Sequence, residues 1–210
     1  PVAAMATVVS DNPDKLLYDV GDEDFATLAI EKRDRFLEAD REIFIFTPYY
    51  IPGDGGIAFV TRLAQKGVRV VIVTNSLAST NHVAVHGHYA KYRKRLLQAG
   101  AELWEIRAVL EMDETGWGHT PERVTLHSKA TFVDRDTVFV GSLNFDPRSI
   151  FLNTEMGIFI ESAELGGPFT EKALEILPEV AYRVTLDDRG NLVWTYDDGA
   201  ERADVFVDLT

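Results

Sequence analysis

Short apolar runs alternate with amphipathic stretches over the first half of the chain. Apolar residues spaced three and four apart predict helices, and uninterrupted apolar runs of five to seven residues predict buried strands. Gly67 and Gly100 each follow a helical pattern and predict where it ends. In chain order the prediction is helix 24–40, strand 42–46, loop 52–56, helix 57–66, strand 68–74, helix 83–99 and strand 101–107.

The second half of the chain has a different pattern, with strands close together. Only Arg135 and Asp136 separate the two apolar stretches 125–134 and 137–142, which predicts a β-hairpin. The other predictions are a loop over 110–123, a strand at 155–161, a helix at 169–177 and strands at 182–186 and 192–196. We expect an α/β fold with a mixed, largely parallel central sheet flanked by helices. Residues 1–13 are predicted to be a flexible lead-in, and residues 14–210 a single domain.

Composition and charge narrow the functional classes. The 210 residues are 46% hydrophobic, which is enough for a core, and they include no cysteine, which excludes thiol chemistry and disulfides. The net charge of −13 argues against a protein whose whole surface binds nucleic acid. Residues 61–110 nevertheless carry eight basic and two acidic side chains, so one surface suited to anions is expected.

The richest chemistry lies in residues 126–144, LHSKATFVDRDTVFVGSLN. Alternate residues of an extended strand share a face, so His127 and Lys129 are expected to point the same way. Ser142 and Asn144 share a face in the same manner. An imidazole, an ammonium, a hydroxyl and a carboxamide in one small volume suit a phosphate group, and Gly141 is expected to let the backbone approach the ligand.

The spacing His127-x-Lys129, four residues, Asp134, six residues, Gly141-Ser142-x-Asn144 resembles the HKD motif of the phospholipase D superfamily. Longer stretches resemble the C-terminal half of bacterial cardiolipin synthases. These stretches are residues 47–52 (TPYYIP), 73–77 (VTNSL), 84–93 (AVHGHYAKYR), 144–149 (NFDPRS) and 153–157 (NTEMG).

The resemblance implies roles for individual residues. One motif histidine of such enzymes attacks the phosphodiester and forms a phosphohistidine, and the other protonates the leaving alcohol; His127 would take one of these two roles. Lys129, Ser142 and Asn144 would hold the phosphate, without metal or other cofactor. Glu155 matches the acidic residue that hydrogen-bonds the motif histidine. Asp134, the third residue of the motif's name, falls on the opposite strand parity and is expected to support the fold.

The family builds its site from two histidine motifs, whereas this chain holds one. The partner is expected to be either an upstream motif of the same parent protein or a second copy in a homodimer. The start at Pro1 and the synthase-like flanking residues favour the first. The implied activity is phosphatidyl transfer between phospholipids, with a phosphatidylglycerol-like donor, by a bacterial enzyme held peripherally at the cytoplasmic membrane surface.

Other candidates remain open beside this interpretation. One alternative is a homodimeric phospholipase D-like phosphodiesterase or nuclease, although nucleic acid is not the favoured partner. Another is a half that binds lipid without catalysis. His86 and Arg148 are candidate contacts for the acceptor or the head group, and Asp146 is a candidate partner of Arg148. The remaining candidates are His82, His86 and His88 as weak metal ligands and Lys91, Arg93, Lys94 and Arg95 as head-group contacts.

Overall fold

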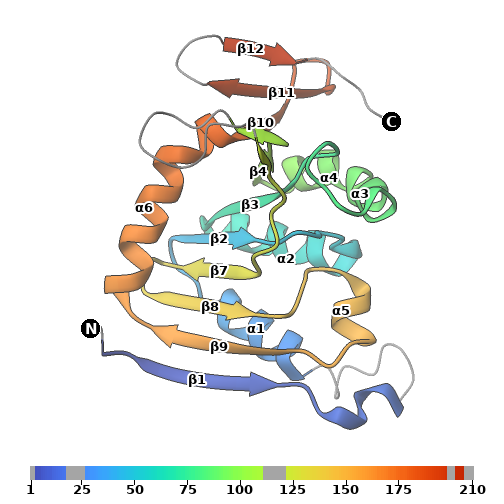
Figure 1. Cartoon of the computed structure of the whole chain (residues 1–210). Coiled ribbons are helices and arrows are strands. Elements are labelled where there is room, and N and C mark those ends of the chain that lie inside the picture. Colours follow the sequence, from blue (N-terminus) through green and yellow to red (C-terminus); the bar gives the residue numbers. More distant parts are fainter. Residues whose placement is uncertain (1–2, 18–26, 111–121, 198–201, 206–210) are drawn as a thin grey trace.

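The computed structural model describes residues 3–17, 27–110, 122–197 and 202–205. Its centre is a ten-stranded sheet in the order β1-β9-β8-β7-β2-β3-β4-β10-β11-β12 (Figure 1). The strands are β1 (Met5–Ser10), β2 (Glu42–Phe46), β3 (Arg69–Asn75), β4 (Ala101–Ile106), β7 (Ala130–Val133), β8 (Thr137–Gly141), β9 (Met156–Glu161), β10 (Ala181–Leu186), β11 (Leu192–Asp197) and β12 (Arg202–Val205). A separate pair consists of β5 (Val109–Leu110) and β6 (Glu122–Arg123).

Helices cover both faces of the sheet. They are α1 (Thr27–Leu37), α2 (Gly53–Lys66), α3 (Val83–Ala90), α4 (Arg93–Gln98), α5 (Pro147–Phe151) and α6 (Ala163–Val180), with a 3-10 turn η1 at Pro13–Leu17. On one face Leu28 and Phe36 of α1 and Leu63 of α2 pack into a core with Ile43 and Ile45 of β2. On the other face Leu177 of α6 packs with the opposite side chains of the same strands, among them Phe44 and Val71. The α/β class and the mixed sheet are therefore confirmed.

The expectation of a largely parallel sheet is wrong. Only β2–β3 and β3–β4 pair in parallel among the described strands, and the other neighbours in the sheet pair antiparallel. The helix-linked strands of the first half make the parallel part, because a parallel pair needs a long crossover. The second half adds strands joined by short connections, and these pair antiparallel.

The expected flexible lead-in is also wrong over its described residues. β1 pairs along β9, with Val8 opposite Ile158, and the following residue Asp11 is buried. The Asp11 carboxylate accepts hydrogen bonds from Lys15 Nζ at 2.6 Å, Leu28 N at 2.9 Å and Glu155 N at 3.0 Å. The described part of this segment is therefore an ordered edge strand followed by a buried carboxylate that accepts several hydrogen bonds.

Several element boundaries differ from the prediction. The helix expected over 83–99 is broken into α3 and α4 at Lys91 and Tyr92, and α2 begins at Gly53, inside the expected loop 52–56. The strand expected over 125–134 pairs only from Ala130, so His127 and Lys129 precede it. The helix expected at 169–177 runs through Pro168 and Pro178 as α6. Most of the loop expected at 110–123 lies outside the described residues.

The antiparallel order of β2, β7, β8 and β9 brings one end of each of these strands to the same side of the sheet. This side, where strands begin and end, is called the edge below and is distinct from the edge strands β1 and β12. β2 and β8 end there, and β7 and β9 begin there, at the right-hand side of Figure 1. In the register, Ala130 lies opposite both Phe46 and Val140, and Gly141 lies opposite Gly157. The residues that directly precede β7 and β9 and follow β8 therefore meet at this edge. None of the helices among the described residues combines the length and apolar character needed to cross a bilayer.

Candidate active site

His127 and Lys129 lie side by side at this edge. The Lys129 ammonium is 3.4 Å from His127 Nε2 and donates a 2.9 Å hydrogen bond to the His127 carbonyl oxygen. The Lys129 carbonyl accepts from Gly141 N at 3.1 Å, which joins this extended segment to the end of β8. The predicted common direction of the two side chains is therefore observed, with the His127 ring exposed to solvent.

Ser142 and Glu155 form the second part of the edge. Ser142 Oγ donates a short hydrogen bond to Glu155 Oε2 and accepts one from Met156 N at 3.0 Å. Glu155 is buried, and its other oxygen accepts from Asn153 Nδ2 at 3.1 Å. Both oxygens of Glu155 are thus occupied. Among the described residues no hydrogen bond joins Glu155 to His127, so the contact implied by the family resemblance is replaced here by one to Ser142.

Gly141 has a structural reason that differs from the expected one. A Cβ atom at this position would lie 2.6 Å from the Met156 carbonyl oxygen and 2.9 Å from Phe139 Cζ. Such distances are shorter than van der Waals contact, so only glycine allows β8 and β9 to approach here. The close approach that Gly141 allows is therefore to the backbone of β9, whereas the sequence predicted an approach to the ligand.

Asn144 presents an unused acceptor. Its Oδ1 atom is buried and has no hydrogen-bond partner among the described residues. Buried polar atoms are nearly always paired, and this oxygen can only accept, so the partner expected here is a hydrogen-bond donor such as water. The neighbouring Leu143 is buried in the core, and this fixes the chain between Ser142 and Asn144.

Two lysines lie near Glu155. Partial burial lowers the pKa of Lys129 below its usual value, and the carboxylates of Glu155 and Asp146 partly offset this effect. Lys32 of α1 is fully buried, with its ammonium 4.1 Å from the ring centroid of Phe145 and 4.3 Å from that of Phe139. Burial lowers the pKa of Lys32 to about 7, against an opposing effect of Glu155. Lys32 was missed in the sequence, although it lies in helical register with Leu28 and Phe36 on the buried face of α1.

Asp134 lies at the opposite end of β7 from Lys129. Its carboxylate accepts from the backbone amides of Asp40, Arg41 and Glu42 at 2.8 to 2.9 Å. Its φ of 51° is in the left-handed region, which aspartate tolerates better than most residues. The third residue of the motif thus ties the β7–β8 hairpin to the start of β2, at a distance from the histidine edge.

His86 does not face an open site. It is buried, its Nε2 lies 2.7 Å from Arg93 Nη2, and burial is the main cause that lowers its pKa. His86 was predicted as a contact for the acceptor or head group, and the structure places it instead in a buried hydrogen-bonding network. Arg93 belongs to the same network, which removes it from the expected head-group set. His82 packs edge-on against Tyr49, and His88 Nδ1 lies near the Ala84 carbonyl, so the three histidines have separate partners.

Arg148 lies in the first turn of α5 and is exposed. The expected pairing with Asp146 occurs through the backbone: the buried Asp146 side chain caps α5 by accepting from Arg148 N at 2.9 Å and Ser149 N at 3.0 Å. The Arg148 guanidinium forms no ion pair with any described residue. It therefore remains a candidate contact for an anion.

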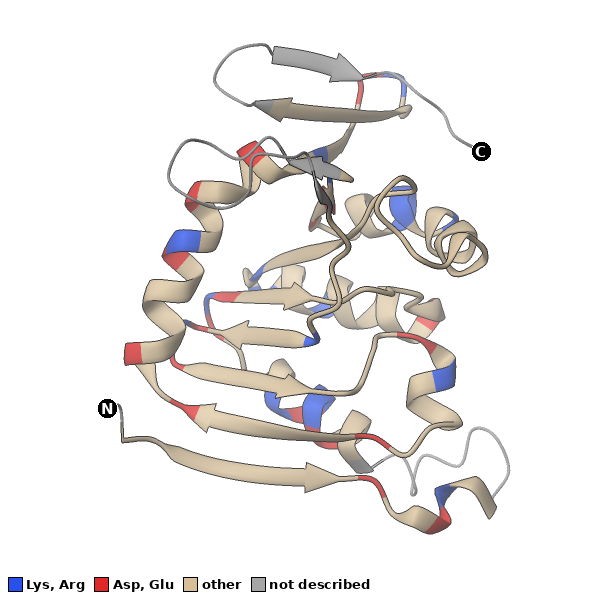
Figure 2. Ribbon diagram, in the orientation of Figure 1, with Lys and Arg blue, Asp and Glu red and all other residues tan. Residues whose placement is uncertain are grey.

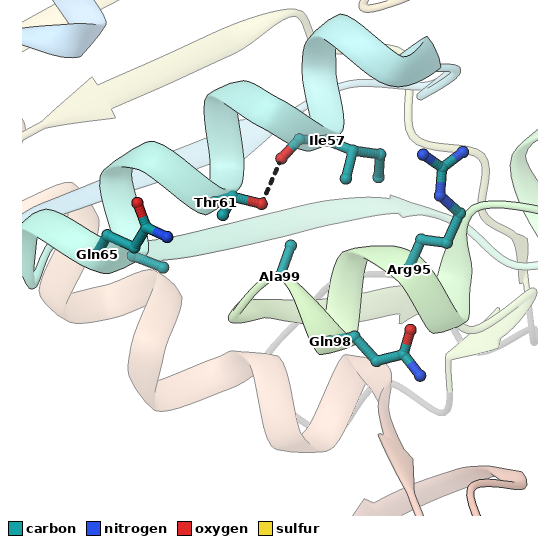
Figure 3. Close-up of a pocket in the computed structure, with 7 residues that line it drawn as sticks. Ile57, Thr61, Gln65, Arg95, Gln98 and Ala99 are labelled. Carbon is teal, nitrogen blue, oxygen red and sulfur yellow. Dashed lines mark hydrogen bonds between the residues drawn. The ribbon is translucent and has the colours of Figure 1, made fainter.

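The basic stretch 61–110 does not form one free cationic surface. Lys and Arg residues are scattered over several helices and strand ends in Figure 2. Arg95 pairs with Asp54 at 2.7 Å, Arg69 with Glu102 at 2.8 Å and Lys66 with Asp40 at 3.1 Å. A pocket of about 490 Å³ between α2 and α4 is lined by Ile57, Thr61, Gln65, Arg95 and Gln98, with Ala64 and Ala99 (Figure 3). None of the motif residues lines it.

Comparison with known proteins agrees with this geometry. The sequence model of the family described as "Cardiolipin synthase, PLD-like domain" matches residues 33–176. The chain is 40% identical to cardiolipin synthase C of Escherichia coli over 155 residues, which are 72% of this chain and 33% of that protein. The chain thus spans about a third of the length of this relative.

Solved structures show the same fold. The phospholipase D family member Nuc from Salmonella typhimurium superposes with a TM-score of 0.59 at 16% identity, over 87% of this chain and 99% of that chain. Phosphatidylserine synthase from Haemophilus influenzae superposes with a TM-score of 0.59 at 15% identity, over 87% of this chain and 40% of that chain. With the family match over residues 33–176, these likenesses show that the chain belongs to the phospholipase D-like domain family described for cardiolipin synthase.

Proposed function

We propose that this chain supplies one of two histidine half-sites for phosphatidyl transfer between phospholipids, as in cardiolipin synthesis. The observation that carries the proposal is the pair of His127 Nε2 and Lys129 Nζ, 3.4 Å apart at an open edge of the sheet. Oxygens of a phosphoryl group bonded to Nε2 would lie within reach of the Lys129 ammonium. A fixed cation at developing negative charge is a large catalytic contribution.

The transfer proceeds in two displacements. In the first, His127 Nε2 attacks the phosphorus of a phosphatidylglycerol-like donor; a P–N bond forms, the P–O bond to glycerol breaks, and the second motif histidine gives the glycerol oxygen a proton. In the second, that histidine takes the proton of the acceptor hydroxyl; the acceptor oxygen bonds phosphorus and the P–N bond breaks. His127 can equally take the acid–base role, with the other histidine as nucleophile.

The rest of the edge supports the same anion. Ser142 is the exception, because its hydroxyl proton goes to Glu155 and its oxygen accepts from Met156 N, so it holds the end of β8 in place and offers no donor. The amino group of the Asn144 carboxamide would donate to a phosphate oxygen. We assign Glu155 to holding Ser142 and to keeping Lys129 charged. Arg148 is the proposed contact for the acceptor or head group.

The second half-site is proposed to come from an upstream histidine motif of the same parent protein. In support, the chain corresponds to 33% of E. coli cardiolipin synthase C and to 40% of phosphatidylserine synthase. The proposed place of action is the surface of the bacterial cytoplasmic membrane, with the domain bound peripherally, because the donor and acceptor are membrane lipids.

The experiment is to replace His127 by Ala and by Asn in the complete parent protein and to follow labelled phosphatidylglycerol in vesicles. We expect turnover to fall by at least about 10³-fold in both variants, since the loss of a catalytic nucleophile or base removes most of the acceleration. The exposed ring should leave the unfolding midpoint unchanged. Wild-type turnover in a folded His127→Ala protein would overturn the proposal.

A homodimeric phosphodiesterase is the second candidate. The favouring observation is the fold likeness to Nuc, which covers 99% of that chain, together with the single histidine motif here. Sedimentation equilibrium of the 210-residue chain over a wide concentration range separates the two candidates. A tight dimer that cleaves a simple phosphodiester such as bis-p-nitrophenyl phosphate would favour the second, and an inactive monomer would favour the first.

A further inference from the structure

Asn75, at the end of β3, binds both backbone groups of the residue that precedes His127. Its Oδ1 accepts from Leu126 N at 2.8 Å, and its Nδ2 donates to the Leu126 carbonyl at 3.0 Å. Nδ2 also lies 3.3 Å from the Pro48 carbonyl, next to the end of β2. Asn75 is only 1% exposed, so these hydrogen bonds are shielded from water.

A second tether acts on the same segment. Thr125 Oγ1 donates to the Ser79 carbonyl at 2.8 Å, and Ser79 Oγ donates to the Ile106 carbonyl at 2.9 Å. Ser79 is fully buried. The two residues before His127 are thus attached through side chains to the chain that follows β3 and to the end of β4.

These contacts matter because no strand pairs with His127 itself, and the first hydrogen bond to the sheet after it joins Gly141 N to the Lys129 carbonyl. Residues 124–129 lie outside the strands, and β7 begins only at Ala130. The His127 ring is exposed, and its one hydrogen-bond neighbour among the described residues is the ammonium of Lys129. The place of the imidazole therefore depends on the backbone at Leu126. A displacement of about 1 Å at a reacting group can lower the rate by about 10²-fold.

We propose that Asn75 is a positioning residue for the reaction: its carboxamide imitates a neighbouring strand at Leu126 and so fixes the backbone from which His127 projects. This inference rests on the proposed function, because it assigns Asn75 a purpose through His127. Asn75 touches neither substrate nor the reacting atoms. The alternative is that Asn75 only stabilises the fold, and the two roles give different measurements.

The test compares Asn75→Ala with Thr74→Val in the parent protein. Thr74 is the matched control because it is the preceding residue, is buried, and donates to the same Pro48 carbonyl at 3.3 Å without touching Leu126. Three quantities are measured: the exchange rate of the Leu126 amide hydrogen, kcat and KM on phosphatidylglycerol vesicles, and the unfolding midpoint.

For Asn75→Ala we expect exchange at Leu126 to be at least about tenfold faster, because its acceptor is lost. We expect kcat to fall at least about 30-fold with KM changed less than about threefold. Asn75→Asp, which keeps the Leu126 N–H acceptor but loses both donor contacts, should lie between Asn75→Ala and wild type. Thr74→Val loses one hydrogen bond and should lower the midpoint by less, leaving kcat and Leu126 exchange within about twofold of wild type.

The proposal is overturned if Leu126 exchange is unchanged in Asn75→Ala, or if Thr74→Val loses as much kcat. Should Asn75→Ala fail to fold, Thr125→Val removes one tether at an exposed position and must show the same two changes, in Leu126 exchange and in kcat, at smaller size. A His127→Ala protein measured alongside separates failure of the proposed function from failure of the positioning role of Asn75. If it keeps turnover the proposed function fails, whereas if it is inactive and Asn75→Ala behaves like Thr74→Val, only the positioning role fails.

Discussion

Two clusters in this protein each hold a histidine, a lysine or arginine, and a glutamate. The closed cluster, His86, Arg93 and Glu105, is buried, whereas the open cluster, His127, Lys129 and Glu155, lies at the sheet edge with its histidine exposed. In the closed cluster Arg93 Nε lies 2.7 Å from Glu105 Oε1, and His86 Nε2 lies 2.7 Å from Arg93 Nη2. Tyr89 Oη and Trp194 Nε1 also donate to Glu105, at 3.0 and 3.1 Å. All of these residues are at least nine-tenths buried.

The open cluster at the sheet edge has the same composition and a different balance. Lys129 forms no ion pair with any described residue, His127 is exposed, and Glu155 bonds to Ser142 and Asn153. Asn144 keeps a buried acceptor without a partner. A cluster whose charges are fully paired has no donor left for a ligand, whereas the Lys129 ammonium beside the exposed His127 ring is suited to bind an anion. Residue type alone therefore does not separate a site from a structural network.

The largest expected effect is on stability, at Glu105. Glu105→Ala leaves the Arg93 guanidinium buried without its carboxylate, and the free energy of unfolding should fall by about 3 to 5 kcal/mol. Turnover per folded molecule should stay at the wild-type value. Glu102→Ala on the same strand is the control: its partner Arg69 is partly exposed, so about 1 kcal/mol or less is expected. Equal losses in urea unfolding would remove the distinction between the clusters.

The next effect is on activity, at Lys129. Lys129→Met removes the ammonium beside Nε2, and turnover should fall on the order of 10²-fold, about 3 kcal/mol in activation free energy. Stability should change by less than about 0.5 kcal/mol, because no ion pair is lost. Lys172→Met, an exposed lysine on α6, is the control with normal turnover expected. A large loss of stability in Lys129→Met would place Lys129 with the closed cluster.

The third prediction concerns Lys32, the buried lysine near Glu155 of the open cluster, and the dependence of stability on pH. Burial lowers its pKa from 10.5 to about 7, so between these values the unfolded chain binds a proton that the folded chain does not. The contribution of Lys32 to stability is therefore present above pH 10.5 and is lost as the pH falls towards 7. Relative to Lys32→Met, the free energy of unfolding of the wild type should fall by about 2 kcal/mol from pH 9 to pH 7. Parallel curves for the two proteins in urea titrations would contradict this.

The smallest effect is expected at Arg148. Its exposed guanidinium should add about 1 kcal/mol to the binding of an anionic lipid surface. Arg148→Ala should therefore raise KM on phosphatidylglycerol vesicles a few-fold at low salt, with kcat little changed and the difference reduced at high salt. Arg189→Ala, in the β10–β11 turn, serves as the control. An unchanged KM would remove Arg148 from the open cluster.

Part of the fold could be read from local pattern alone. The strands at 42–46, 69–75 and 101–106 and the helix that ends at Gly67 follow directly from apolar runs and a glycine stop. The short helix α5 was missed, although Asp146 followed by Pro147 is a helix start signal. The break between α3 and α4 has no comparable signal, since Lys91 and Tyr92 are ordinary helix residues.

The partners of polar residues were harder to predict than the elements. Asp11 appears in a short polar stretch, and nothing near it in the sequence indicates bonds to Leu28 and Glu155. Glu155 was expected on His127 and lies on Ser142 instead. Asn75 was seen only as part of a family-like stretch. In each case the contact joins residues far apart in the chain, and its existence depends on the packed sheet.

The sequence by itself determined the α/β class, the family and the candidate set of side chains proposed to act on a phosphodiester, because apolar periodicity and motif spacing are local properties of the chain. The tertiary structure decided which charged groups are paired and which are free. It closed His86 and Arg93 into a buried network, moved Asp134 to the far end of its strand, and attached Leu126 to Asn75. The physical reason is that burial and hydrogen bonding depend on the neighbours that long-range strand pairing supplies, and those neighbours are not written in any one stretch of sequence.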